Sequence, residues 1–153
     1  MPHLYKCSSK FGIQPLALAA LPVLLLLSSG AGLAQTMELR LGQSSYEIEL
    51  AKTPHQRQIG LMHRQHLSAR QGMLLVYSQA GDHRIWMKNM RIPLRVYWID
   101  ENFIVVSVQR LQPCSETPCP VYSAPGDTRY VLELGDYEHQ LARGDKIEGI
   151  DGY

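Results

Sequence analysis

The sequence lacks the motifs of several common enzyme classes. Its 153 residues contain no glycine-rich phosphate loop, no Gly-x-Ser-x-Gly elbow and no His-Glu-x-x-His zinc motif. Cysteine is scarce as well, since the chain has three, and no second cysteine pair exists that could complete a metal centre with four ligands. The sequence therefore predicts neither a metal site nor a cofactor, and it gives little direct support to an enzyme.

Neither sign of charge is in marked excess. The chain has 15 basic and 14 acidic residues, whereas general binding to nucleic acid draws on a surplus of lysine and arginine. We therefore expect no nucleic-acid partner, and any cationic function must be local.

A long apolar run is also missing. The most hydrophobic stretch, residues 16–27, is shorter than the roughly 20 residues that a membrane-spanning helix needs. Lys6 and Lys10 precede this stretch and small residues follow it, which is typical of a signal peptide. We expect residues 1–34 to be a signal peptide cut after Ala34, with an uncleaved N-terminal anchor as the alternative.

Removal of that leader would take away two lysines and no acidic residue, which leaves residues 35–153 with a formal charge of −1. This part of the chain is long enough for one domain with one hydrophobic core, and it contains no repeat and no domain linker. We expect a single domain without a stable membrane span, located in the periplasm or secreted.

The cysteines of this region, Cys114 and Cys119, stand in the motif CSETPC between prolines. In an oxidising compartment this spacing predicts a disulfide that closes a small surface loop. A redox-active pair would more typically be separated by two residues. Closing so short a loop is expected to stabilise the fold by less than roughly 3 kcal/mol.

Alternation of apolar and polar residues predicts a mainly β fold. Residues 37–41 and 46–50 are expected to form a hairpin around the turn 42–44. The run 72–77 is apolar on both faces, as in a central strand covered on both sides. Further strands are expected at residues 83–87, 94–99, 103–111, 129–134 and 146–147.

For two of these strands the sequence also predicts which side chains face the core. In strand 103–111 the inward residues are expected to be Ile104, Val106 and Val108. Strand 129–134 is expected to place its apolar residues on one face, namely Tyr130, Leu132 and Leu134. Trp98 is expected in the core, because it shares its parity with the apolar residues before it.

Two short helices are expected between the strands. Thr53 as N-cap, Pro54 at the first helical position and Gln56 at the third predict a helix that runs to about residue 63 or 64. Gly60 inside that helix would cost about 1 kcal/mol against alanine, which suggests close approach to another backbone. A second helix is expected at residues 136–143, before Gly144. The whole pattern predicts a compact, antiparallel, jelly-roll-like sandwich or barrel.

Two pairs of polar residues resemble sites without being strong candidates. Glu47 and Glu49 point the same way along one strand, and we interpret them as a solvated strand face. His63 and His66 are spaced by three, but no glutamate lies between them, so we interpret them as surface histidines.

The stretch 84–100, RIWMKNMRIPLRVYWID, has the densest mixture of aromatic and cationic residues. Pro93 opposes a continuous helix here, so a turn through residues 88–92 is expected between two strands. Guanidinium groups suit carboxylates or phosphates, and aromatic faces stack on apolar surfaces, so this stretch predicts an anionic or sugar-like ligand. The candidate ligand-binding residues are Trp86, Lys88, Asn89, Arg91, Arg95 and Tyr97.

Five blocks of the chain follow in order the pattern of the DUF192 family. They are GLMHR (60–64), GMLLVY (72–77), IWMKNMRIPLRVYWID (85–100), PCSETPCPVY (113–122) and RYVLEL (129–134). Through them the chain resembles that family over nearly all of residues 35–153. The resemblance implies a jelly-roll-like β domain, often exported, with no established biochemical activity. Where the family commonly has an aspartate after Ile-Pro-Leu, this chain has Arg95, which favours a cationic site.

Three classes of function follow from these observations. The first is a binding module for an anionic or sugar-like ligand, and the second is a structural or assembly factor of the cell envelope with no small ligand. The third is a hydrolase-like enzyme, which two carboxylates in one cleft would favour. Its residues would be sought among Lys88, Asn89, Asp100 and Glu133. An exposed, concave, aromatic surface would favour binding, whereas burial of both tryptophans would favour the structural class.

Overall fold

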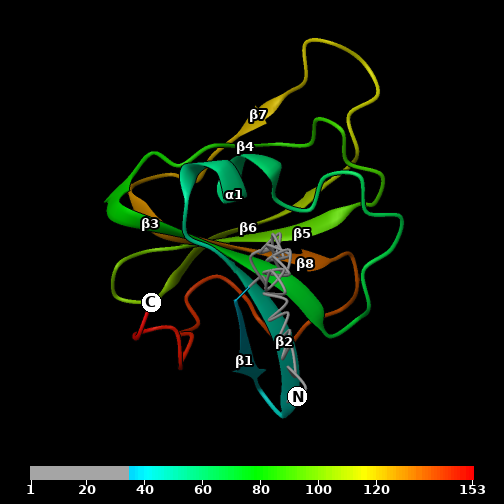
Figure 1. Ribbon diagram of the computed structural model, residues 1–153. Helices are drawn as coiled ribbons and strands as arrows, with labels where there is room; N and C mark the ends of the chain where they lie inside the picture. Colours follow the sequence, from blue (N-terminus) through cyan, green and yellow to red (C-terminus); the bar gives the residue numbers. More distant parts are fainter. Residues whose placement is uncertain (1–34) are drawn as a thin grey trace, which may run out of the picture. The chain divides into compact units, whose positions relative to one another are not determined.

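The computed structural model describes residues 35–153, which form a mainly β structure (Figure 1). The predicted signal peptide and its cleavage after Ala34 lie outside these described residues. Within them, no helix is long and apolar enough to cross a membrane. The elements are β1 (Thr36–Leu41), β2 (Ser44–Ala51), α1 (Pro54–Ile59), β3 (Gln71–Gly81), β4 (Ile85–Trp86), β5 (Leu94–Ile99), β6 (Val105–Leu111), β7 (Val121–Tyr122) and β8 (Thr128–Gly135).

The main sheet has six strands in the order β1-β2-β3-β8-β5-β6, and β4 pairs with β7 in a second, two-stranded sheet. The main sheet is open, so the barrel alternative is wrong and the mainly β prediction is confirmed. Strands β3 and β8 are central, as predicted for the apolar run 72–77. The predicted hairpin is also confirmed, because β1 and β2 pair antiparallel around a turn in which Gly42 has a φ of 60°.

One strand pair departs from the antiparallel expectation. β2 and β3 are parallel, with Ile48 opposite Gly72. Parallel neighbours need a crossover connection, and here α1 with residues 60–70 returns the chain to the starting end of the sheet. This crossover places α1 beside the cleft described below.

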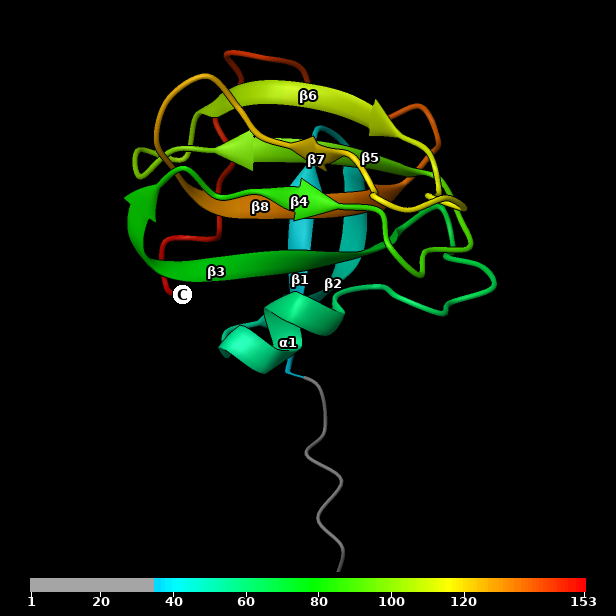
Figure 2. The same ribbon diagram turned by 90° about the horizontal axis from the view of Figure 1, so that it is seen from above.

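The sheet buries both of its faces, and each face is covered by different segments. In Figure 1, α1, β4 and β7 lie on one side of the sheet, and the red C-terminal segment lies on the other. Figure 2 shows β4 and β7 in front of the long strands, with α1 beside β3. The core beneath α1 and β4 includes Leu61, Met73, Leu75, Val96, Trp98 and Val131. The core on the opposite face includes Leu39, Leu74, Tyr97, Tyr130, Leu132 and Leu134.

Several boundaries differ from the sequence expectation. The first helix ends at Ile59, because Gly60 has φ 50° and ψ −131°, which is not a helical conformation. In β6 the buried residues are Val105 and Leu111, whereas the predicted inward set of Ile104, Val106 and Val108 is only half-buried. A register shift where β5 ends, between residues 98 and 99, changes which side chains of β6 face the core.

The predicted helix at residues 136–143 is absent from the described structure. Side chains anchor this segment to the sheet instead. The Asp136 carboxylate lies 2.5 Å from Arg110 Nη2, and His139 Nε2 lies 2.8 Å from the carbonyl oxygen of Gly135. The predicted last strand reduces to one isolated bridge between Ile104 and Lys146.

Candidate ligand-binding cleft

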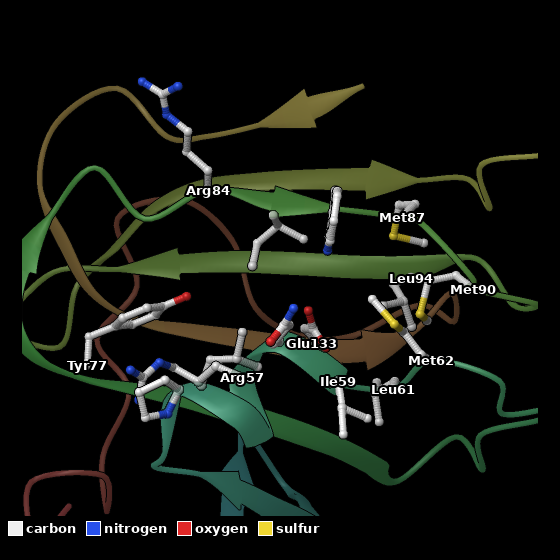
Figure 3. A pocket seen from close by; sticks show the side chains of 16 residues that line it. Arg57, Ile59, Leu61, Met62, Tyr77, Arg84, Met87, Met90, Leu94 and Glu133 are labelled. Carbon is white, nitrogen blue, oxygen red and sulfur yellow. The ribbon is translucent and has the colours of Figure 1, made fainter. Parts of the chain in front are cut away.

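A cleft of about 260 Å³ lies between α1, the residues that follow it, and β4 (Figure 3). Arg57 and Tyr77 stand at one end, and Glu133 lies between the two ends. The other end is formed by three methionines, Met62, Met87 and Met90. The residues that line it come from α1, β3, β4, β5 and β8 and from the segments beside α1 and β4, so that the site exists only in the folded chain.

Glu133 is the buried acid of the cleft. It lies in the central strand β8, opposite Met73 of β3 and Val96 of β5, and the residue is 5% exposed. Within residues 35–153 its carboxylate has no hydrogen-bond or ion-pair partner. Burial raises the pKa of Glu133 to about 7, and the positive charge of Arg64 opposes this increase. The cleft therefore has a protonatable carboxyl group at its base.

The end of α1 brings backbone close to this carboxyl. A capping box begins the helix, in which Thr53 Oγ1 accepts from Gln56 N at 3.2 Å and Gln56 Oε1 accepts from Thr53 N at 2.9 Å. At the other end, a Cβ at Gly60 would lie 3.5 Å from Glu133 Oε2. The close approach expected at Gly60 is thus to a side-chain carboxylate and not to another backbone.

A second carboxylate near the cleft is already paired. Glu49 lies opposite Met73, in the same row across the sheet as Glu133. Arg64 donates to both of its oxygens, at 2.6 and 2.7 Å, and this hydrogen bonding raises the pKa of Arg64. Glu49 is therefore held by an arginine and is not part of a free solvated face.

The aromatic end of the cleft is built on Arg57. Its Nη1 donates to the carbonyl oxygens of Lys52 and Val76, at 2.6 and 2.9 Å. Its guanidinium lies 4.7 Å from the ring centre of Tyr77, whose other neighbour is the stacked ring of His83 at 3.5 Å. Burial raises the pKa of the Tyr77 hydroxyl, so this group is neutral and can donate a hydrogen bond.

Four of the six predicted ligand-binding residues lie in or near the wall that carries β4. Trp86 lines the cleft and is 41% exposed. Lys88 is exposed, with its Nζ 5.1 Å from the ring centre of Trp86. Asn89 has a φ of 59° and its Nδ2 lies 3.8 Å from the sulfur of Met62. Arg91 is exposed in the same turn and does not line the cleft.

The structure does not bring Arg95 and Tyr97 to this wall. Side chains alternate along β5, so both residues face away from α1. Tyr97 is fully buried on the opposite face, where burial raises its pKa to about 12, and Arg95 lies 3.3 Å from Glu138. The six predicted residues therefore do not form one surface. The predicted core position of Trp98 is confirmed.

Of the four residues named for a hydrolase, Glu133 lines the cleft. Asp100 lies elsewhere, where its Oδ1 accepts hydrogen bonds from the backbone of Asn102 and Ile104 and so holds a turn. No pattern in the sequence identified Arg57, Tyr77 or the methionines as site residues. One feature of the sequence could have identified Glu133 as a site residue. It is an acid inside the apolar strand RYVLEL, and acids are rarely found in a strand that is buried on both faces.

Cys114 and Cys119 lie at disulfide-bonding distance, with their Cα atoms 5.8 Å apart. The backbone N of Cys114 donates to the carbonyl oxygen of Met87 at 3.1 Å, and Lys88 forms a bridge to Cys114. This loop is therefore bonded to the segment that carries Met87, which lines the cleft. Within residues 35–153, no group of three or more His, Cys, Asp or Glu side chains is placed to hold a metal ion.

The fold and the cleft define a mainly β protein with a candidate small-ligand site. Residues 33–149 match the model of the DUF192 family, described as Uncharacterized ACR. The chain belongs to the DUF192 family. Four of the blocks that carry the resemblance contribute residues to the cleft, namely 60–64, 72–77, 85–100 and 129–134.

Two solved structures are similar to this chain. A protein of unknown function from Novosphingobium aromaticivorans shares 25% identity, with a TM-score of 0.65 over 91% of this chain and 100% of the other. A candidate transcription regulator from Sinorhizobium meliloti shares 27% identity, with a TM-score of 0.64 over 74% of this chain and 92% of the other. No curated protein matches the chain significantly.

Proposed function

We propose that the chain is a binding module and that its cleft holds a small, sugar-like ligand. The observation that carries the proposal is the carboxyl of Glu133, buried at the base of the cleft without a partner within residues 35–153. Its oxygens are not among the fully enclosed side-chain atoms that lack a partner, so they are open to the cleft and can accept hydrogen bonds. A ligand hydroxyl or amine can donate to Glu133, so the cleft favours ligands that donate hydrogen bonds.

The same carboxyl disfavours an anionic ligand. Because its pKa is about 7, Glu133 is partly ionised at neutral pH and repels negative charge. Arg57 compensates incompletely, since its Nη1 is engaged by two backbone carbonyl oxygens. The proposal thus narrows the anionic or sugar-like class predicted from the sequence to its sugar-like member.

The walls and the size of the cleft suit one sugar ring. Trp86 lines the cleft with much of its side chain exposed, and aromatic rings bury apolar surface well. The ring of Tyr77 is already in contact with Arg57 and His83, so this residue offers its hydroxyl to a ligand. The volume of about 260 Å³ lies just below the roughly 300–1,000 Å³ of pockets for drug-sized ligands. We therefore propose a monosaccharide or one terminal residue of a longer chain.

The two other classes of function receive less support. A pKa near 7 is what a general acid needs, but glycoside hydrolysis uses two carboxylates, and Glu133 is the acidic residue among the described side chains that line the cleft. An assembly factor of the envelope without a small ligand offers no partner for this buried carboxyl. A binding role accounts for both the exposed tryptophan and the buried acid.

The proposal includes export of the protein to the periplasm or the medium. N-terminal sequencing of the protein recovered from the exported fraction tests this part, because a start at Gln35 is expected. A start at Met1 would mean that the leader is retained as an anchor.

Calorimetric titration with three matched ligands tests the binding role. The ligands are a neutral hexose, its amino analogue and its uronic acid, each at about pH 8, where Glu133 is mostly ionised. We expect the neutral and amino sugars to bind and the uronic acid to bind most weakly. The uronic acid should gain affinity at about pH 5, where the Glu133 carboxyl is protonated.

Variants connect the binding to the cleft. Glu133→Gln keeps the shape of the side chain but replaces an acceptor oxygen by a donor, and we expect affinity for the neutral sugar to fall about tenfold. Glu101→Gln, in an exposed turn, is the matched control and should bind like the parent. Equal affinity of parent and Glu133→Gln for every sugar, or tightest binding of the uronic acid, would contradict the proposal.

A further inference from the structure

The end of the cleft opposite Tyr77 is rich in sulfur. Met62 comes from the segment after α1, and Met87 and Met90 come from the turn after β4. All three line the cleft, and Figure 3 draws their side chains at the same end of it. The only other methionines in residues 35–153 are Met37 and Met73, which do not line it.

Hydrogen bonds hold the two methionine-bearing segments together. His63 N donates to the carbonyl oxygen of Asn89 at 3.0 Å, and Asn89 Nδ2 lies 3.8 Å from the Met62 sulfur. Within the second segment, Met90 N donates to the carbonyl oxygen of Met87 at 3.3 Å. The two backbone segments that carry the three methionines are therefore held together.

The burial of the three residues leaves one side of the cluster accessible. Met87 and Met90 are 1% and 9% exposed, whereas Met62 is only partly buried at the rim of the cleft. Leucine would fill the same core volume as methionine, so packing alone does not require sulfur at three neighbouring positions. What the three side chains share, beyond volume, is a polarizable thioether.

We propose that Met62, Met87 and Met90 form a binding site for a soft monovalent cation, Cu(I) or Ag(I). Soft sulfur ligands select Cu(I) over hard divalent cations, which prefer oxygen. Three thioethers are neutral, so the ion keeps its positive charge.

The inference goes beyond the sugar-binding proposal, because it uses the other end of the cleft and a different ligand. It also departs from the sequence expectation that the chain holds no metal. That expectation rested on cysteine and histidine ligands, and thioether ligands have no comparable spacing motif. The sulfur cluster is assembled from segments that lie more than twenty residues apart in the chain.

Titration of the full chain with Ag(I) tests the site. The chain should carry Cys7→Ser, so that no free thiol competes while the disulfide stays closed. Ag(I) needs no reductant, and calorimetry should show one ion bound per chain. A parallel titration with Cu(I), kept reduced by ascorbate and competed with a chromophoric chelator, should give the same stoichiometry. A parent protein that binds neither ion would overturn the proposal.

Methionine variants assign the ligands. Met62→Leu, Met87→Leu and Met90→Leu conserve volume and should each cost less than about 1.5 kcal/mol of stability. Removing one ligand should weaken Ag(I) binding by at least about tenfold, and the triple variant should bind no ion. Met37→Leu, in the core of the opposite face, should bind like the parent.

Two results would contradict the assignment. One is a folded triple variant that binds Ag(I) as tightly as the parent. The other is loss of binding only when Cys114 and Cys119 are both replaced by serine, which would place the ion on sulfur of the disulfide loop. If the triple variant is unfolded, the Ag(I) affinity of Met62→Leu alone tests the assignment, and an unchanged affinity would contradict it. Met62 is only partly buried, so its replacement disturbs the core least.

Discussion

Gly60 lies against the carboxylate of Glu133, so that a Cβ at position 60 would stand 3.5 Å from Glu133 Oε2. This relationship joins the end of α1 to the centre of the sheet. It also depends on glycine, because a φ of 50° with a ψ of −131° is a conformation that other residues rarely adopt. The position of the cleft wall therefore depends on one residue without a side chain.

Replacement of this glycine should destabilise the fold. The new Cβ of Gly60→Ala is in ordinary contact with Glu133, so the cost comes mainly from the backbone and is about 1–3 kcal/mol. Urea denaturation measures it. Gly152→Ala, which has open space and no positive φ, should stay within about 0.5 kcal/mol of the parent. Equal effects of the two replacements would contradict this account of Gly60.

Stability should depend on pH through Glu133. The pKa of this carboxyl is about 7 in the folded chain and 4.5 in a free side chain, so folding takes up a proton between these values. Stability is therefore highest below about pH 4.5 with respect to this group, and it falls as pH rises through about 7. Glu133→Gln should be more stable than the parent by up to about 3 kcal/mol at about pH 8.

Urea denaturation of both proteins at several pH values measures this difference. Near pH 4 the parent carboxyl is protonated in both states, so the advantage of the variant should vanish. Glu101→Gln is again the exposed control. A difference between Glu133→Gln and the parent that does not change with pH would show that Glu133 does not titrate as described.

Arg64 should control the acidity of the buried carboxyl. Its positive charge lowers the pKa of Glu133, in opposition to burial. Arg64→Met removes that charge and leaves Glu49 unpaired nearby, so the pKa of Glu133 should rise above its present value of about 7. Carbon-13 NMR titration of the Glu133 carboxyl measures it, with the exposed Arg143→Met as control. An unchanged or lower pKa would refute the role of Arg64.

The disulfide should stabilise the cleft wall more than the sheet. Replacement of Cys114 and Cys119 by serine should cost less than about 3 kcal/mol, because the closed loop is short. Amide exchange at position 114, where the N–H donates to the carbonyl oxygen of Met87 in the parent, should be faster in this variant, while the core amide of Leu74 stays protected. Faster exchange at Leu74 to the same degree would mean that the loop supports the whole fold.

The strands were predictable where burial is periodic. Alternating residues predicted β1 and β2, because each presents a regular apolar face to one core, and the dense apolar runs of β5 and β8 serve both cores. The helix predicted at residues 136–143 was wrong, because the ion pairs of Asp136 and the hydrogen bonds of His139 hold this segment in another conformation. The parallel pairing of β2 and β3 was also missed, since pairing partners are not encoded in either strand alone.

The candidate site was predictable only in part. Trp86 was identified by the local density of aromatic and cationic residues, and it does line the cleft. Arg95 and Tyr97 share that local density, but strand alternation turns them to the opposite face. Glu133 and Met62 reach the cleft through sheet pairing and the crossover after β2, and no local pattern in the sequence records those contacts.

The central claim is that a sugar-like ligand binds against Glu133 in the cleft. Amide NMR of the labelled protein, titrated with the neutral hexose, tests it most directly. We expect the largest shifts at Gly60, at Glu133 and at the indole N–H of Trp86, with none at Tyr46 or His139 on the opposite face. Shifts confined to that opposite face, or no saturable shifts at all, would contradict the account.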